Sequence, residues 1–154
     1  MDGFAIAAEI LVGQAIGARS LENLRRSVVL TCKWGAITAA CMSLFFAIFG
    51  SYIINLMTTA TDVRSVAEQY LPWMILAPLA GGASWMFDGI FIGATRTADM
   101  RNMMLISFGV YLISLIILLP IFDNHGLWMA LNIFLCARGI TLWWRYPKVE
   151  LFIS

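Results

Sequence analysis

Charged residues are scarce in this chain. Asp, Glu, Lys and Arg make up 12% of its 154 residues, whereas hydrophobic residues make up 61%. An average soluble domain carries about 25% charged residues. The composition therefore favours a membrane protein over a small soluble protein with an unusually apolar core. The net charge of +1 also excludes the basic surface typical of nucleic-acid-binding domains, so we expect no nucleic-acid partner.

Cysteine and histidine are also rare. Cys32, Cys41 and Cys136 form no C-x-x-C pair, and His125 lies in a short turn. This pattern favours buried apolar cysteines and a satisfied turn histidine over a metal site or a disulfide framework. The sequence has no Walker A, G-x-S-x-G or H-E-x-x-H motif, so nothing in it favours ATP hydrolysis or covalent catalysis. We expect no enzyme activity, no metal and no cofactor.

Long apolar segments are what the sequence does contain. A helix that crosses about 30 Å of hydrocarbon needs about 20 apolar residues. Apolar segments occupy residues 3–18, 34–57, 71–95, 103–122 and 126–144. A signal peptide is disfavoured in the short first segment, because Asp2 replaces a basic start and Glu9 interrupts the apolar run. We predict a single all-α membrane domain with a bundle of five transmembrane helices, the first of them shortened.

The basic residues outside these segments fall on alternate sides of the predicted membrane. Eight lie in the first and third connections and the C-terminal tail, and Arg64 in the second connection is alone on the other side. The eight are Arg19, Arg25, Arg26, Lys33, Arg96, Arg101, Arg145 and Lys148. The positive-inside rule then predicts an outside N-terminus and a cytoplasmic C-terminus. We expect residues 20–33, which mix aliphatic and basic side chains, to lie along the inner membrane surface.

Two carboxylates interrupt the apolar segments. Glu9 stands ten residues before Arg19, and Asp88 stands eight residues before Arg96, which places them about 15 and 12 Å from the inner edge. An ionised carboxylate at mid-helix costs roughly 2.5 to 3.5 kcal/mol. Each must be protonated, paired or turned to a water-filled cavity. They are candidates for a cation or proton site, or else structural carboxylates that bond a neighbouring helix. Gln14 is a further polar group that needs a partner.

Glycines are spaced for close helix packing in the same two segments. Gly13 with Gly17, and Gly89 with Gly93, form G-x-x-x-G motifs. This spacing puts both glycines on one helix face, where another helix can approach closely. We therefore predict tight packing around the two segments that carry the carboxylates.

The third apolar segment also contains residues that disturb helices. Pro72 and Pro78 each remove a backbone donor, and Gly81 with Gly82 adds bending freedom. Broken helices near a charge are a recurring feature of secondary transporters. The alternative is a static kink that fits the bundle.

Arg138 is a further charge inside an apolar segment. It stands seven residues before Arg145, or about 10 Å inside the cytoplasmic edge. Since the arginine stem is long and apolar, we expect its head to reach the lipid headgroups.

Three stretches together resemble one transporter family. DGFAIAAEILVGQAIGAR (2–19), WMFDGIFIGATRTADMRN (85–102) and NHGLWMALNIFLCARGITLWWR (124–145) resemble the eighth, tenth and twelfth helices of the multidrug and toxic compound extrusion (MATE) family, DinF-type branch. The resemblance runs over essentially the whole chain. It implies the C-terminal part of a twelve-helix exporter of the bacterial inner membrane, about helices eight to twelve. That part would be an incomplete C-terminal lobe.

The resemblance also implies a mechanism. Members of this family export small amphipathic or cationic compounds, driven by a proton or sodium gradient. The implied partners are therefore membrane lipid, such substrates and the missing N-terminal lobe. Asp88 matches a carboxylate implicated in cation coupling in the sodium-driven branch. In the DinF-type branch the proton site is usually assigned to an aspartate of the first helix, which this chain lacks. We therefore expect residues 1–154 to be inactive alone.

Two other functions stay open at this point. One is a non-transporting packing or assembly protein, which includes the inert product of a truncated reading frame. The other is a lipid-linked substrate flippase of the same superfamily, for which more basic residues along the cavity would be expected, and only Arg138 fits that description.

Overall fold

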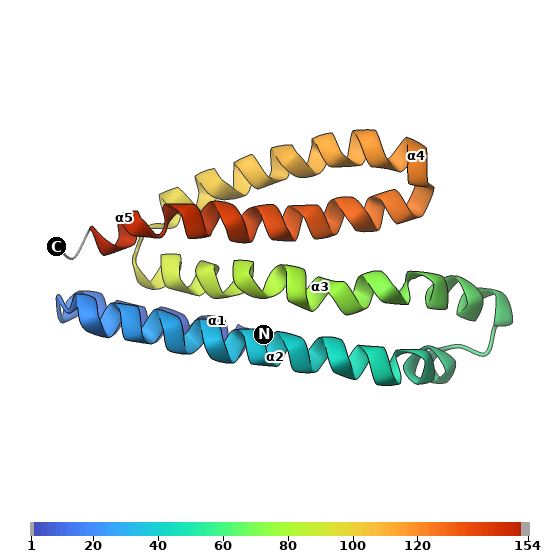
Figure 1. Cartoon of the computed structure of the whole chain (residues 1–154), viewed down its shortest axis with the longest axis horizontal. Helices are drawn as coiled ribbons and strands as arrows, with labels where there is room; N and C mark the ends of the chain where they lie inside the picture. Colours follow the sequence, from blue (N-terminus) through green and yellow to red (C-terminus); the bar gives the residue numbers. More distant parts are fainter. Residues whose placement is uncertain (1, 152–154) are drawn as a thin grey trace.

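The computed structural model describes residues 2–151, and they form a bundle of helices without strands (Figure 1). The helices are α1 (Asp2–Gly17), α2 (Leu21–Met57), α3 (Thr61–Gly93), α4 (Thr97–Arg145) and the short α5 (Pro147–Glu150). This confirms the all-α class. Three helices, α2, α3 and the one that begins at Thr97, are long and apolar enough to cross a membrane, and α1 is a shorter apolar helix.

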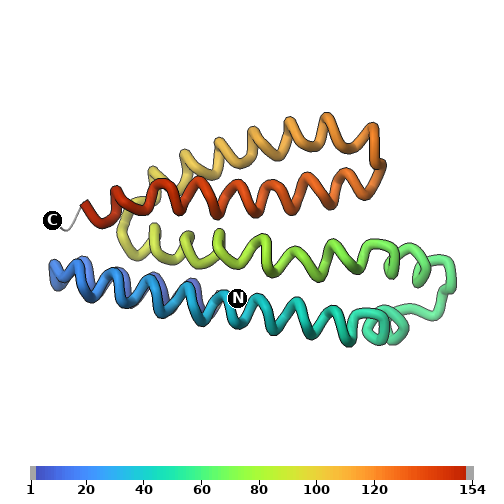
Figure 2. The backbone as a smooth tube through the Cα atoms, in the orientation of Figure 1, coloured from blue at the N-terminus to red at the C-terminus, as the bar shows by residue number. Residues whose placement is uncertain are grey.

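Helix α4 is a hairpin of two limbs and accounts for the last two predicted segments. Its backbone breaks at Asp123, where φ is 48° and ψ is −130°, and the chain reverses there (Figure 2). Gly126 fits beside this turn because it lacks a side chain: a Cβ would lie 2.2 Å from the carbonyl oxygen of Leu118. The limbs cover residues 97–122 and 124–145.

Helix α2 begins earlier than the sequence analysis predicted. Ser20 caps it, and its hydroxyl accepts a hydrogen bond of 3.3 Å from the Asn23 N–H. The helix then continues unbroken to Met57. The prediction that residues 20–33 form a separate surface segment is wrong, because no proline or turn interrupts them. At 37 residues the helix is about 55 Å long, so it extends beyond a hydrocarbon layer of about 30 Å.

The turns after α1 and α3 have the same design. Arg19 and Thr95 adopt left-handed φ values of 49° and 56°. In the first turn the Ser20 N–H bonds to the Ala15 carbonyl at 3.0 Å, and the second turn repeats this pattern. This is the Schellman arrangement, which satisfies the last carbonyls of a helix.

These two turns lie at the same end of the bundle as α5 (Figure 1). The Arg25 guanidinium contacts the Glu150 carboxylate there through two nitrogens, at 2.8 and 3.0 Å, and Arg96 donates to the Lys148 carbonyl at 2.6 Å. The α2–α3 connection and the Asp123 turn lie at the opposite end. Arg25, Arg96 and Lys148 therefore lie at one end of the bundle, and the sidedness in the membrane stays a prediction.

Glycines bring α1 and α3 into backbone contact. A Cβ at Gly89 would lie 2.2 Å from the Ala5 carbonyl oxygen, and one at Gly93 would lie 2.3 Å from that of Glu9. Gly13 faces the same contact, since a Cβ there would lie 3.5 Å from the Gly93 carbonyl oxygen, whereas a Cβ at Gly17 would have no neighbouring atom within 4 Å. Close packing therefore occurs at the first three glycines, and Gly17 does not take part in it.

We expect Gly89→Ala to destabilise the protein. Its new Cβ would overlap backbone atoms of α1, and overpacking of this kind costs about 1 to 3 kcal/mol. The matched control is Gly17→Ala, whose Cβ would enter open space. The measurement is the free energy of unfolding of purified protein in detergent. Equal stability of the two variants would contradict this account of the packing.

We expect topology reporters attached at the two ends of the bundle to lie on opposite sides of the membrane, because of the positive-inside rule. A reporter fused after Ser154 should give a cytoplasmic signal, and one inserted at residues 58–60 an extracytoplasmic signal. An extracytoplasmic signal after Ser154 would show that the orientation is wrong.

Candidate functional site

An ion pair joins α3 to the second limb of α4. The Arg138 Nη2 lies 2.9 Å from Asp88 Oδ2 and 3.0 Å from Oδ1. The Asp88 side chain is only 18% exposed, and the Arg138 side chain is only 16% exposed. Among the described residues, Arg138 is the one cation within salt-bridge distance of Asp88. The carboxylate is therefore not free, because a permanently charged guanidinium neutralises it.

This pair corrects the prediction for Arg138. Its guanidinium is not free to bind headgroups but bonds to α3, at a carboxylate 50 residues away in the sequence. Charged groups inside membrane segments pair with one another to avoid hydrocarbon. A signal for the pair was present in the sequence, since the predicted depths of Asp88 and Arg138, about 12 and 10 Å from the same edge, are nearly equal.

The helices approach closely beside the pair. A Cβ at Gly139 would lie 3.2 Å from the Ala83 Cβ. Ser84 is fully buried at the same contact and donates a 2.8 Å hydrogen bond to the Gly81 carbonyl. The Arg138 Nε is buried and has no hydrogen-bond partner among the described residues. The guanidinium is therefore only partly satisfied in its present position.

The prolines and paired glycines of α3 do not break the helix. Helix α3 runs unbroken through Pro72 and Pro78. The Ser43 hydroxyl of α2 donates at 2.7 Å to the Ile75 carbonyl, three residues before Pro78, where the helical hydrogen bonding is disturbed. Gly82 lets α2 approach, since a Cβ there would lie 3.2 Å from the Ala39 Cβ. Of the two alternatives that the sequence left open, the broken helix is not found in α3, and the static kink stays a prediction.

The other predicted polar residues lie apart from the pair. Glu9 is half-buried on α1, and its side chain makes no ion pair with the described residues. Gln14 is exposed and lines a polar pocket of about 300 Å³ with Asn23, Arg26 and Ser27. Neither makes a hydrogen bond to Asp88, so the structure does not assemble the three candidates into one site.

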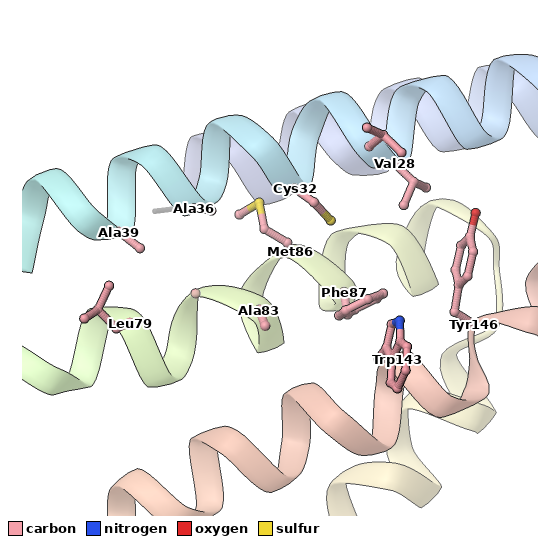
Figure 3. Close-up of a pocket in the computed structure, with 12 residues that line it drawn as sticks. Val28, Cys32, Ala36, Ala39, Leu79, Ala83, Met86, Phe87, Trp143 and Tyr146 are labelled. Carbon is pink, nitrogen blue, oxygen red and sulfur yellow. The ribbon is translucent and has the colours of Figure 1, made fainter.

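An apolar cavity of about 500 Å³ lies between α2, α3 and the end of α4. In Figure 3 aliphatic side chains from α2 face α3, and the aromatic rings of Phe87, Trp143 and Tyr146 lie at one end. The sequence analysis did not identify this cavity, because its residues come from three segments far apart in the sequence. The full lining is Val28, Val29, Cys32, Ala36, Ala39, Leu79, Gly82, Ala83, Met86, Phe87, Trp143 and Tyr146.

His125 is a satisfied turn residue, as the sequence predicted. The Trp73 indole N–H donates to His125 Nδ1 at 3.0 Å, and the Gln69 amide nitrogen lies 3.1 Å from Nε2. The ring also packs on Tyr70, with 4.7 Å between ring centroids. These contacts fasten the Asp123 turn to α3.

Long apolar helices that contain an internal ion pair and enclose an apolar cavity are typical of a membrane protein with several spans. The MatE family profile matches residues 1–118, and the chain belongs to this family of transporters. It is therefore a multi-pass membrane protein.

Two curated relatives and one solved structure are similar to it. DNA damage-inducible protein F of Escherichia coli (strain K12) is 39% identical over 142 residues, 92% of this chain and 31% of that protein. Multidrug resistance protein MdtK of Proteus mirabilis (strain HI4320) is 28% identical over 106 residues, 69% of this chain and 22% of that protein. The fold matches the eukaryotic MATE transporter AtDTX14 with a TM-score of 0.82, at 16% identity, over 99% of this chain and 37% of that one.

We expect the ion pair to matter for stability. Arg138→Gln leaves the Asp88 charge buried without a partner, which costs about 3 to 5 kcal/mol. Adding Asp88→Asn removes that charge, so the double variant should be more stable than Arg138→Gln alone. Unfolding of purified protein measures the stability of Arg138→Gln, of Asp88→Asn and of the double variant.

The control for this cycle is Arg145→Gln. Arg145 is 30% exposed and 3.3 Å from Asp99, which keeps a second partner, Arg96, at 2.6 Å. Its loss should cost no more than about 1 kcal/mol. Additive effects of the Asp88 and Arg138 changes would show that the two side chains do not interact in the folded protein.

Proposed function

We propose that the chain is the C-terminal part of a cation-coupled antiporter that exports small amphipathic or cationic compounds, with Asp88 as its coupling carboxylate. The Asp88–Arg138 pair carries this proposal. An ionisable residue within a membrane segment typically marks an ion pathway. The coupling ion is a proton or sodium, either of which a carboxylate binds.

The proposal that the activity is export rests on the similarity to known proteins. The chain is similar to a protein whose name describes multidrug resistance, and it belongs to a transporter family. It spans 31% and 22% of the length of the two curated relatives and 37% of the length of the solved structure. We infer that it works with a further N-terminal part, since alternating access needs two halves that move about a central site.

The apolar cavity supports the class of substrate. Its wall is aliphatic, and Phe87, Trp143 and Tyr146 add aromatic faces. An apolar cavity with few polar groups suits the apolar part of an amphipathic molecule, and aromatic faces attract a cationic group. A flippase for lipid-linked substrates is less favoured, because Arg138, the basic residue that would face such a headgroup, is already paired with Asp88.

We expect export by the complete transporter that contains this chain to depend on Asp88. In efflux-deficient cells the wild type should lower dye accumulation in a gradient-dependent way. Asp88→Asn should abolish this effect, because the amide cannot take up a coupling cation, while the protein stays inserted. Arg145→Gln, which is outside the pair, serves as the control and should export normally.

Residues 1–154 expressed alone should leave accumulation at the empty-vector level. Export restored by co-expression of the N-terminal part would agree with the proposal. Export at the wild-type rate by Asp88→Asn would overturn the proposal that Asp88 binds the coupling cation. Gradient-dependent export by residues 1–154 alone would overturn the proposal that this chain needs an N-terminal part.

A further inference from the structure

Arg138 holds Asp88 in an arrangement that is not the tightest available to an arginine. One nitrogen, Nη2, contacts both carboxylate oxygens, and Nε is buried without a partner among the described residues. The exposed pair of Arg25 and Glu150 shows the alternative, in which Nε and Nη2 each bond one oxygen. That two-pronged geometry is the strong one. A buried donor left unpaired is a cost that a purely structural pair would be expected to avoid.

The position of Asp88 along α3 also bears on where the guanidinium can move. Gly139 is packed against Ala83 and Ser84, and Asp88 lies four residues further along α3, about 6 Å towards its C-terminal end. Helix α3 and the second limb of α4 run in the same direction, towards the end that carries α5 (Figure 2). The Arg138 side chain therefore already leans towards the predicted cytoplasmic side, where headgroups would accept it about 10 Å from its backbone.

We propose that Arg138 is a tethered cation that occupies the Asp88 carboxylate whenever the coupling cation is absent, and that the arriving cation displaces it towards the cytoplasmic headgroups. This inference rests on the proposed function, in which Asp88 binds the coupling cation. Arginine suits the role because it keeps its charge at all physiological pH values.

The tethered Arg138 keeps the charge of the site balanced in both states. With Arg138 on Asp88 the pair is neutral, and with a proton or sodium ion on Asp88 and Arg138 withdrawn the carboxylate is again compensated. The site thus avoids an unpaired carboxylate within the membrane, which would oppose the conformational change of the empty transporter. Arg138 and the coupling cation compete for one carboxylate, so each lowers the apparent affinity of the other.

The test uses the full-length transporter in proteoliposomes and measures the sodium concentration, and separately the pH, that gives half-maximal export. Removal of the competitor in Arg138→Gln should lower the required cation concentration by at least about tenfold, the factor expected if Arg138 occupies Asp88 at least nine-tenths of the time. A proton-coupled transporter shows this as a half-maximal pH about one unit higher. If the half-maximal sodium concentration shifts, the coupling ion is sodium. If the half-maximal pH shifts, it is a proton.

Two variants isolate the charge itself. Arg138→Lys keeps a cation on a flexible stem and should stay within about threefold of the wild type, because a competitor is still present. Arg145→Gln removes an arginine from the same helix but outside the pair and should not shift the half-maximal concentration. Arg138→Met, neutral and suited to apolar surroundings, replaces Arg138→Gln if the latter does not give folded protein.

The outcomes separate this inference from the proposed function. If Asp88→Asn abolishes export but neutral variants at Arg138 leave the half-maximal concentration unchanged, Arg138 is only structural and the inference is overturned while the proposed function stands. If Arg138→Lys shifts as far as Arg138→Gln, the charge is not the determinant and the inference also falls. If Asp88→Asn exports normally, both fall.

Discussion

A charge inside hydrocarbon must have a partner, and this constraint explains how the bundle is assembled around Asp88. The carboxylate sits on α3, and the Arg138 guanidinium that neutralises it comes from the far limb of α4. For the two to meet, α4 must reverse at Asp123 and place its second limb along α3. Gly126 and Gly139 make the reversal and the close approach possible, because a side chain at either position would meet neighbouring atoms.

Helix α3 is the element on which the other long helices converge, since it packs against α1, α2 and α4. Three different means hold these contacts. Backbone contact at Gly89 and Gly93 joins it to α1, the Ser43 hydroxyl joins it to α2, and the ion pair joins it to α4. Lipid supplies little hydrophobic driving force between helices, so such close and polar contacts carry the association. Asp88 thus lies on the helix whose movement would affect all the others.

Local features of the sequence predicted the fold class and one contact between helices. Apolar runs gave the all-α class, and the G-x-x-x-G spacing led to the contact of Gly89 and Gly93 with α1. Features that depend on two distant segments were missed. Arg138 was expected to reach the headgroups because its partner lies 50 residues away, and the apolar cavity combines residues of three helices. The start of α2 was also missed, although Ser20 is a typical capping residue.

The most direct test of this account is the ionisation state of Asp88 in the resting transporter. Difference infrared spectroscopy of the reconstituted protein at neutral pH, without sodium or substrate, distinguishes a carboxylate from a protonated carboxyl group when wild type is compared with Asp88→Asn. An ion pair with Arg138 predicts that the substitution removes carboxylate absorption and no protonated-carboxyl absorption. If the substitution instead removes a protonated-carboxyl band, the account is contradicted, because a neutral Asp88 does not form an ion pair with Arg138.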